Sequence, residues 1–352
     1  VLRENYEGVS VSSHWEKEMS KENVILIDYD APNDWEFHKA IEKATGNKWR
    51  VYKAVSNENH GGVLQKFIRY AKYFLVPMKI AKDHKNYNKV LAWQQFYGLI
   101  LAFYFRMFRV KNAPEIVVLT FIYKPKKSFV GKVYDKFMRY IVTSGYIKYF
   151  VVFSESEKKR YADYFDAPEA RFVFETLGYE DKTQEVPICN PDNVYLAAGR
   201  SNRDYKFLVD AWSKRKEHLK IICDTLSLKS VPDNIEILAD CHDNDFFREL
   251  AKCKAVIVPL EDTHISSGQL VIIQAMMYGK PVVVTENDTV KDYVDTGRTG
   301  AVIKKTEKDL SAAIAALSNE AYYEEMSAAE RRQYENKFSV YAMGTAIGKL
   351  LS

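Results

Sequence analysis

The chain has 352 residues, of which 47% are hydrophobic and 28% are charged, and its net charge is +4 at pH 7. This length exceeds one comfortable domain, so two domains are expected. The composition is that of a globular enzyme and excludes a fibrous or disordered protein. The longest apolar run, 96–105, is too short to span a bilayer.

The cysteines and the first residues bear on the cellular compartment. Four cysteines lie in the second half without C-x-x-C spacing: Cys189, Cys223, Cys241 and Cys253. Such a set predicts reduced thiols, and neither a disulfide framework nor a zinc site. The charged start of the chain shows no signal peptide. We therefore expect a cytoplasmic protein.

Strand and helix signals alternate along the whole chain, which predicts parallel doubly wound sheets. In the first half, strands are expected at 22–30, 48–55, 89–93, 115–121 and 149–154, and helices at 35–45, 62–85, 129–141 and from 155. In the second half, strands are expected at 194–198, 219–223, 235–238, 255–259, 281–285 and 300–303, and a helical segment at 322–351.

An acidic, proline-containing connector near 180–192 separates the two halves. We therefore predict an N-terminal α/β domain over 1–185 and a C-terminal α/β domain over 186–330. The last segment, 331–352, is a helix that is a candidate to pack back on the first domain.

Two segments of the second half combine glycine with groups that bind anions. In the first, Gly199 directly follows the strand at 194–198, and Arg200 and Arg203 come next. Ligands of open α/β sheets bind beyond the carboxyl ends of strands, and arginine forks match phosphate oxygens. The two arginines are therefore candidate pyrophosphate ligands, with a solvated surface turn as the alternative.

The second segment, 264–285, predicts a polar turn, a buried helix from Gly268 to Gly279, and a buried strand. The start of such a helix offers N–H groups and a positive dipole to an anion. The candidate ligands of this segment are Ser266, Ser267, Gly268, Gln269, Leu270 and Gln274. His264 is a further candidate, with an ordinary solvated histidine as the alternative.

The pattern GRxxRDYxxLxxA at 199–211, followed by SSGQxVxxQAMxxGKPVVVT at 266–285, resembles retaining glycosyltransferases of the GT4 group. The resemblance covers about 194–305. It implies the GT-B fold, in which two Rossmann-like domains face a central cleft. The second domain then binds the nucleotide-sugar, and the first faces the acceptor.

The chain departs from the family at two positions. The family has two glutamates eight residues apart, and this chain has Ser266 and Gln274 in their places. The Gln274 amide still donates and accepts hydrogen bonds, either at a ribose hydroxyl or at nearby backbone. Ser266 does not replace a carboxylate that faces a sugar hydroxyl, so the hexose is left open.

The resemblance implies a retaining hexosyltransferase of the EC 2.4.1 type, acting in the synthesis of cell-surface polysaccharide or glycoconjugate. It would move a hexose from a UDP- or GDP-sugar to a glycan or lipid-linked acceptor. Arg200 and Arg203 would be catalytic, because cations aimed at the departing diphosphate lower the barrier. The nucleotide-sugar is then a co-substrate, and neither a metal nor another cofactor is expected.

Two other functions stay open at the level of sequence. The missing glutamates favour a catalytically weak GT-B pseudoenzyme that binds a sugar or nucleotide beside an active transferase. A UDP-sugar epimerase of GT-B shape is the third interpretation. Asp28 and Asp30 form a D-x-D motif, which binds metal in the GT-A fold but here also ends a strand. His60 lies in a glycine-containing turn and is a candidate to face the cleft.

Positive charge is concentrated in one block, because residues 61–150 hold 17 Lys and Arg against 3 Asp and Glu. Basic amphipathic helices lie on anionic membranes, where a lipid-linked acceptor is presented. We therefore predict peripheral attachment to the inner face of the cell membrane, with a solvated helix face as the alternative. No nucleic-acid-binding module is present, so nucleic acid is not an expected partner.

Overall fold

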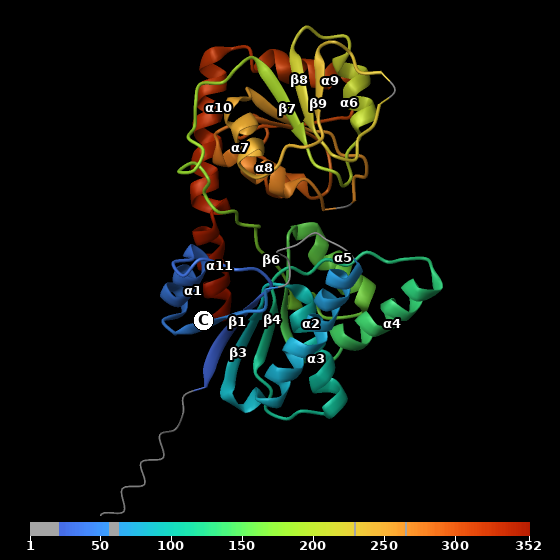
Figure 1. Ribbon diagram of the computed structural model, residues 1–352, viewed down its shortest axis with the longest axis vertical. Helices are drawn as coiled ribbons and strands as arrows, with labels where there is room; N and C mark the ends of the chain where they lie inside the picture. The colour runs from blue at the N-terminus through green and yellow to red at the C-terminus, as the bar shows by residue number, and fades with distance from the viewer. Residues whose placement is uncertain (1–20, 56–62, 229, 265) are drawn as a thin grey trace, which may run out of the picture.

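The computed structural model describes residues 21–55, 63–228, 230–264 and 266–352. They form two α/β domains arranged end to end (Figure 1). Each domain is built on a six-stranded sheet in which all neighbouring strands are parallel. The predicted pair of doubly wound domains is confirmed. No described helix is long and apolar enough to cross a membrane.

The N-terminal sheet has the strand order β2-β1-β3-β4-β5-β6. Its strands are β1 (Glu22–Ile27), β2 (Trp49–Lys53), β3 (Tyr87–Ala92), β4 (Glu115–Val118), β5 (Ile147–Val152) and β6 (Phe172–Phe174). Runs such as Val-Ile-Leu-Ile in β1 are apolar at every position because helices cover both faces. The order reverses between β1 and β3, which places a crevice at their carboxyl ends.

Helices of the N-terminal domain lie on both faces of this sheet. They are α1 (Glu36–Thr45), α2 (Val63–Lys82), α3 (Gln95–Phe108), α4 (Phe129–Val142) and α5 (Glu155–Phe165). Side chains of α2, α3, α4 and α5 share one apolar core, and α1 contributes to the core on the opposite face. Short 3-10 turns lie at His84–Asn86 and Glu169–Arg171.

The C-terminal sheet has the order β12-β11-β10-β7-β8-β9. Its strands are β7 (Val194–Ala198), β8 (His218–Ile222), β9 (Ile235–Leu238), β10 (Ala255–Val258), β11 (Val282–Thr285) and β12 (Ala301–Ile303). This is the order of dinucleotide-binding folds, and the switch point lies between β7 and β10. The two predicted anion-binding segments follow these two strands, so the fold brings them to one place.

Among the described residues, five helices and a 3-10 turn accompany the C-terminal sheet. They are α6 (Tyr205–Trp212), α7 (Asp243–Lys252), α8 (Gln269–Met277), α9 (Glu307–Ala316), α10 (Glu320–Gln333) and the turn Val290–Asp292. Helix α8 is buried almost all round, as its apolar sequence predicts. A wide π-turn at Tyr334–Phe338 then leads into α11 (Val340–Leu351).

Helix α11 crosses back to the N-terminal domain and packs on α1 (Figure 1). Glycines make this contact close, because a Cβ added at Gly348 would lie 2.5 Å from the Cβ of Ala44. At Gly344 an added Cβ would lie 2.7 Å from the carbonyl oxygen of Phe37. The side chains of Met343 and Ile347 join the core beneath α1. One face of the first domain is therefore completed by residues that follow the second.

Some details differ from the sequence-based expectation. The segment 322–351 is not one helix, since the π-turn breaks it and the Ser339 side chain caps α11 by accepting from the amide of Ala342. Strand β6 was not predicted, because three residues are too few for a periodic signal. In α2, the apolar residues Phe74 and Leu75 are both exposed. The buried side of that helix is formed instead by Tyr73, Val76 and Ile80.

Candidate active site

A pocket of about 340 Å³ opens at the carboxyl ends of β7, β8 and β9. Its walls come from strand ends, from the start of α7 and from one side of α8. The lining includes Gly199, Arg200, Cys223, Asp224, Cys241, His242, Phe246, Val271, Gln274 and Tyr179. Apolar walls with a few polar groups suit a small organic ligand that has a flat ring and hydroxyls.

The turn after β7 places Arg203 over the strand end. Gly199 has φ of +109°, which favours glycine, and an added Cβ would lie 2.9 Å from Nη2 of Arg203. Arg203 donates from Nε to the carbonyl oxygen of Ala198 at 3.0 Å, and from Nη1 to Ser267 Oγ at 3.1 Å. Nη2 has no acceptor among the described residues. Its N–H groups are thus available to a ligand beside Gly199.

The two predicted arginines differ in environment. Burial lowers the pKa of Arg203, but a guanidinium stays charged at neutral pH. Arg200 is exposed, and its Nε lies 2.7 Å from Oδ1 of Asp224 at the pocket rim. Arg203 therefore offers a fixed and poorly solvated charge. Arg200 offers a charge that must leave a surface ion pair before it reaches a ligand.

The loop before α8 completes the anion-binding edge. Gly268 caps the helix with φ of +91°, and Ser267 Oγ donates to the carbonyl oxygen of Ser201 at 3.1 Å. These contacts tie the loop to the turn after β7. The Gln269 side chain is buried and donates to Thr289 Oγ1 at 3.3 Å, so Gln269 offers its backbone N–H rather than its amide. Leu270 is exposed on the first turn.

Gln274 lies one further turn along α8, with its buried side chain at the pocket wall. Its amide lies beside the hydroxyl of Tyr179, whose pKa is raised by burial, and the Gln274 amide opposes this effect. Tyr179 comes from the connector between the two domains. The connector therefore reaches the same pocket as α8, and Gln274 has a partner that orients its amide.

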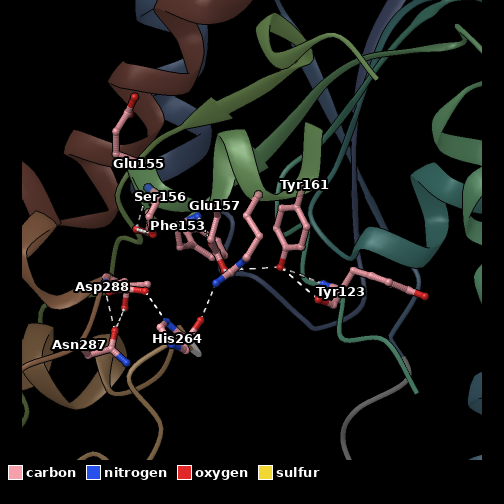
Figure 2. Close-up of polar contacts among 12 residues, drawn as sticks. Tyr123, Phe153, Glu155, Ser156, Glu157, Tyr161, His264, Asn287 and Asp288 are labelled. Atoms are coloured by element: carbon pink, nitrogen blue, oxygen red, sulfur yellow. Dashed lines mark hydrogen bonds and ion pairs between the residues drawn. The ribbon is translucent and has the colours of Figure 1, made fainter. Parts of the chain in front are cut away.

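The N-terminal domain meets this loop through α5 (Figure 2). Arg160 donates to the carbonyl oxygen of His264 and lies 2.7 Å from Oε1 of Glu157. The Glu157 carboxylate is buried, accepts from the amide of Phe153 at 3.2 Å, and lies beside the hydroxyl of Ser266. Burial raises the pKa of Glu157, and Ser266 and Arg160 oppose this effect. Ser266 thus faces a carboxylate of the other domain.

The remaining sequence candidates are placed as follows. His264 is exposed, and Nδ1 lies 2.6 Å from Oδ2 of Asp288, which raises the pKa of His264 (Figure 2). His60 lies outside the described residues. Asp28 is buried with Gln94 Nε2 at 3.4 Å, and Asp30 pairs with Lys53 at 2.6 Å.

The part of the chain that the structure describes contains no group of three or more His, Cys, Asp and Glu side chains placed to hold a metal ion. Asp28 and Asp30 of the D-x-D motif directly follow β1 and contact Gln94 and Lys53.

Two residues of the site escaped sequence analysis. Glu157 and Arg160 lie in the helix that was expected from residue 155, to which the sequence assigned no role. The available signal was the spacing of Glu157, Tyr161 and Phe165, which places a carboxylate in an apolar stripe of α5. A carboxylate at such a position needs a partner. The partner could not be named without the arrangement of the two domains.

Comparison with known proteins identifies the C-terminal half. Residues 192–320 match the family model described as "Glycosyl transferases group 1". The C-terminal domain is therefore similar to group 1 glycosyltransferases. This match confirms the resemblance to glycosyltransferases at the level of the broad family. A search of curated proteins gives no significant match.

The chain is also similar to solved glycosyltransferase structures over nearly its whole length. Sucrose-phosphate synthase from Thermosynechococcus elongatus has a TM-score of 0.65 at 14% identity, with 94% of this chain and 98% of that chain covered. HepE from Anabaena in complex with UDP has a TM-score of 0.65 at 13% identity, with 94% and 99% covered. WaaG, a glycosyltransferase involved in lipopolysaccharide biosynthesis, has a TM-score of 0.60 at 14% identity, with 94% and 99% covered. These likenesses show the fold, and the expected GT-B architecture is confirmed.

Proposed function

We propose that the chain is a retaining hexosyltransferase of the GT4 type that uses a UDP- or GDP-sugar. One observation carries this proposal: Arg203 joins the turn after β7 to the loop before α8 across the switch point, beside a pocket of small-molecule size. The match of residues 192–320 to a glycosyltransferase family agrees with it. Complexes of HepE with UDP and with UDP-glucose support a uridine donor.

In the proposed complex the nucleoside occupies the pocket and the Gln274 amide contacts the ribose. The diphosphate lies between Gly199 and the start of α8, where the backbone N–H groups of Gly268 and Gln269 and Nη2 of Arg203 meet it. Gly199 is needed there because any larger residue would meet the guanidinium. The hexose then extends past Ser266 toward the N-terminal domain.

The proposed reaction breaks the bond between the anomeric carbon and the β-phosphate oxygen. The acceptor oxygen forms the new bond on the same face, and its proton passes to the departing diphosphate. Negative charge grows on the leaving oxygen, and a buried guanidinium stabilises that charge more than a solvated one. Arg203 is therefore the main proposed catalytic group, and Arg200 joins it when it leaves Asp224. With these cations no metal is needed in the proposed scheme.

The acceptor is proposed to be a glycan or a lipid-linked glycan, in the synthesis of cell-surface polysaccharide or glycoconjugate. The likeness to WaaG supports this assignment. We further propose that the protein works in the cytoplasm, attached peripherally to the inner face of the membrane. The density of Lys and Arg in 61–150 supports this location.

A thermal-shift panel of UDP-, GDP-, dTDP- and ADP-sugars tests the proposal, together with release of hexose from the donor. A ligand at about 100 times its Kd should stabilise the protein by about 2.7 kcal/mol. The assay is repeated in EDTA, which should leave turnover unchanged. Absence of a shift with every nucleotide-sugar contradicts the proposal. A shift without hydrolysis or transfer also contradicts it and favours a binding protein.

A further inference from the structure

One projection of the N-terminal domain exposes apolar side chains in a basic surround. We call residues 122–133 the finger. They run from the loop after β4 to the second turn of α4. Its exposed apolar residues are Ile122, Phe129, Val130 and Val133, and Phe129 and Val130 keep 81% and 75% of their accessible surface. Large apolar side chains gathered on a surface mark an interaction site.

The finger has a defined structure that holds these side chains outward. Ser128 caps α4 by accepting from the amide of Gly131 at 3.1 Å. A Cβ at Gly131 would lie 2.4 Å from the carbonyl oxygen of Lys126, so only glycine lets the finger fold closely onto the helix. At its base, Tyr123 donates to Asp135 Oδ1 at 2.6 Å. Both ends of the finger are therefore anchored.

Neighbouring helices also expose apolar side chains. Helices α2 and α3 expose Phe74, Leu75, Met107 and Phe108, and α4 also exposes Tyr140. The Tyr104 hydroxyl donates to the carbonyl oxygen of Phe74 and so links α2 to α3. Helices α2, α3 and α4 pack side by side on the same face of the sheet. The exposed residues thus belong to one side of the domain.

The charge on the finger has one sign. Lys124, Lys126, Lys127 and Lys132 of the finger and Lys136 just beyond it are all exposed, and none has a carboxylate partner among the described residues. The single acid in 122–140 is Asp135, which is bound by Tyr123, Tyr164 and Arg139. Protein interfaces are depleted in lysine, whereas lysines around an apolar tip suit phosphates above acyl chains. The charge pattern therefore favours a lipid surface over a protein partner.

We propose that the finger inserts Phe129 and Val130 into an anionic bilayer while its lysines bind lipid phosphates. The finger follows the carboxyl end of β4, and Figure 1 shows this chain running outward from the sheet edge that faces the C-terminal domain. Insertion therefore brings the cleft to the membrane surface. Only the purpose of this insertion, which is access to a lipid-linked acceptor, rests on the proposed function.

Flotation with vesicles tests the inference, using phosphatidylcholine alone and phosphatidylcholine with 30% phosphatidylglycerol. The wild type should float with the anionic vesicles in low salt and be released in 0.5 M NaCl, where charges are screened over a few ångströms. Phe129→Asp/Val130→Asp should lower the partition at least about ten-fold. Lys126→Glu/Lys127→Glu should lower it at least about twenty-fold, at about five-fold per lysine.

Matched controls change the same residue types elsewhere. Ile188→Asp replaces an exposed apolar residue, and Lys216→Glu/Lys308→Glu reverses two exposed charges of the C-terminal domain. Both controls should float like the wild type. All four finger positions are exposed, so unchanged unfolding temperatures are expected and verify the fold.

The inference is overturned if Phe129→Asp/Val130→Asp floats like the wild type, or if the wild type does not bind anionic vesicles. A wild type that is a dimer and does not bind vesicles, with a Phe129→Asp/Val130→Asp variant that is a monomer, would assign this surface to a contact between two copies. That result also overturns the inference. UDP-induced stabilisation is measured in the same samples. Vesicle failure with that stabilisation intact defeats this inference alone, and loss of both defeats the proposed function as well.

Discussion

Arg160 of the N-terminal domain donates a hydrogen bond to the carbonyl oxygen of His264, in the loop that precedes α8 of the C-terminal domain. Further contacts join the same two domains near the turn Val290–Asp292: Ser154 Oγ donates to Asp292 Oδ2 at 2.7 Å, and the Tyr293 hydroxyl donates to the carbonyl oxygen of Phe153 at 2.9 Å. The loop proposed to bind the diphosphate is therefore positioned partly by the other domain.

We expect Arg160→Ala to loosen this loop. Hydrogen exchange of the amides at 266–268 should rise, and the KM for the donor should increase about ten-fold, because a hydrogen bond from a charged group contributes about 1.5–3 kcal/mol. Lys159→Ala, at an exposed neighbour on α5 that pairs with Asp163, is the control and should change neither. Equal exchange in both variants would show that α5 does not hold the loop.

Arg203→Ala should lower kcat/KM by about 100-fold, which corresponds to about 3 kcal/mol of transition-state stabilisation. Arg203→Lys should recover little of this, since a lysine cannot reach Ala198, Ser267 and a phosphate with one planar group. Steady-state kinetics and titration with UDP separate the effect on turnover from that on binding. Arg298→Ala, an exposed arginine elsewhere in the domain, is the control. A fully active Arg203→Ala enzyme would remove this residue from the mechanism.

The burial of Glu330 should make the free energy of unfolding depend on pH, which can be measured without any substrate. Its side chain is fully buried, Oε1 accepts from the amide of Val282 at 3.1 Å, and burial raises its pKa well above the ordinary 4.5. Between 4.5 and the raised value, the folded state keeps a proton that the unfolded state has lost. The free energy of unfolding should therefore fall as pH rises, by up to about 1.4 kcal/mol per pH unit.

Glu330→Gln should remove the part of this slope that Glu330 contributes, because an amide keeps the shape and does not ionise. Urea unfolding at pH 5, 6, 7 and 8 measures the slope for each protein. Glu324→Gln, at an exposed position of the same helix, should leave the wild-type slope in place. Parallel curves for wild type and Glu330→Gln would mean that Glu330 ionises alike in the folded and unfolded states.

Gly348→Val should destabilise the protein by about 1–3 kcal/mol, since the new side chain meets Ala44 at the contact of α11 with α1. Lys349→Val adds the same residue at an exposed position of α11 and should have a much smaller effect. Denaturant unfolding measures both. Equal losses would mean that helix propensity, rather than the close contact, limits the choice at Gly348.

Sequence patterns predicted the core of the fold because buried parallel strands are short apolar runs between polar turns. Strands β7, β10 and β11 and the buried helix α8 follow directly from such runs. The meeting of Arg203 with the loop before α8 also follows, since both segments leave neighbouring strands at the same sheet edge. These expectations need only local periodicity and parallel topology.

Contacts between domains could not be predicted in this way. Ser266 and Glu157 are over 100 residues apart, and neither lies in a pattern that names the other. The exposed side of α2 could not be predicted either, because Tyr73 and Phe74 are similar in hydrophobicity and only packing decides which of them is buried. Sequence periodicity sets a helix face to within about one residue, which is too coarse for such a choice.

The return of α11 has a consequence for the order of folding during synthesis. Val340, Met343, Ile347 and Leu351 cover Phe37 and Ile41 in one core of the N-terminal domain. That domain is made first, yet this part of its core remains open to water until the entire second sheet has left the ribosome. At about 5–20 residues per second, an apolar face waits for tens of seconds. A ribosome that stalls within the second domain therefore leaves a first domain with an exposed apolar face. Chaperone binding and aggregation would then compete for that face.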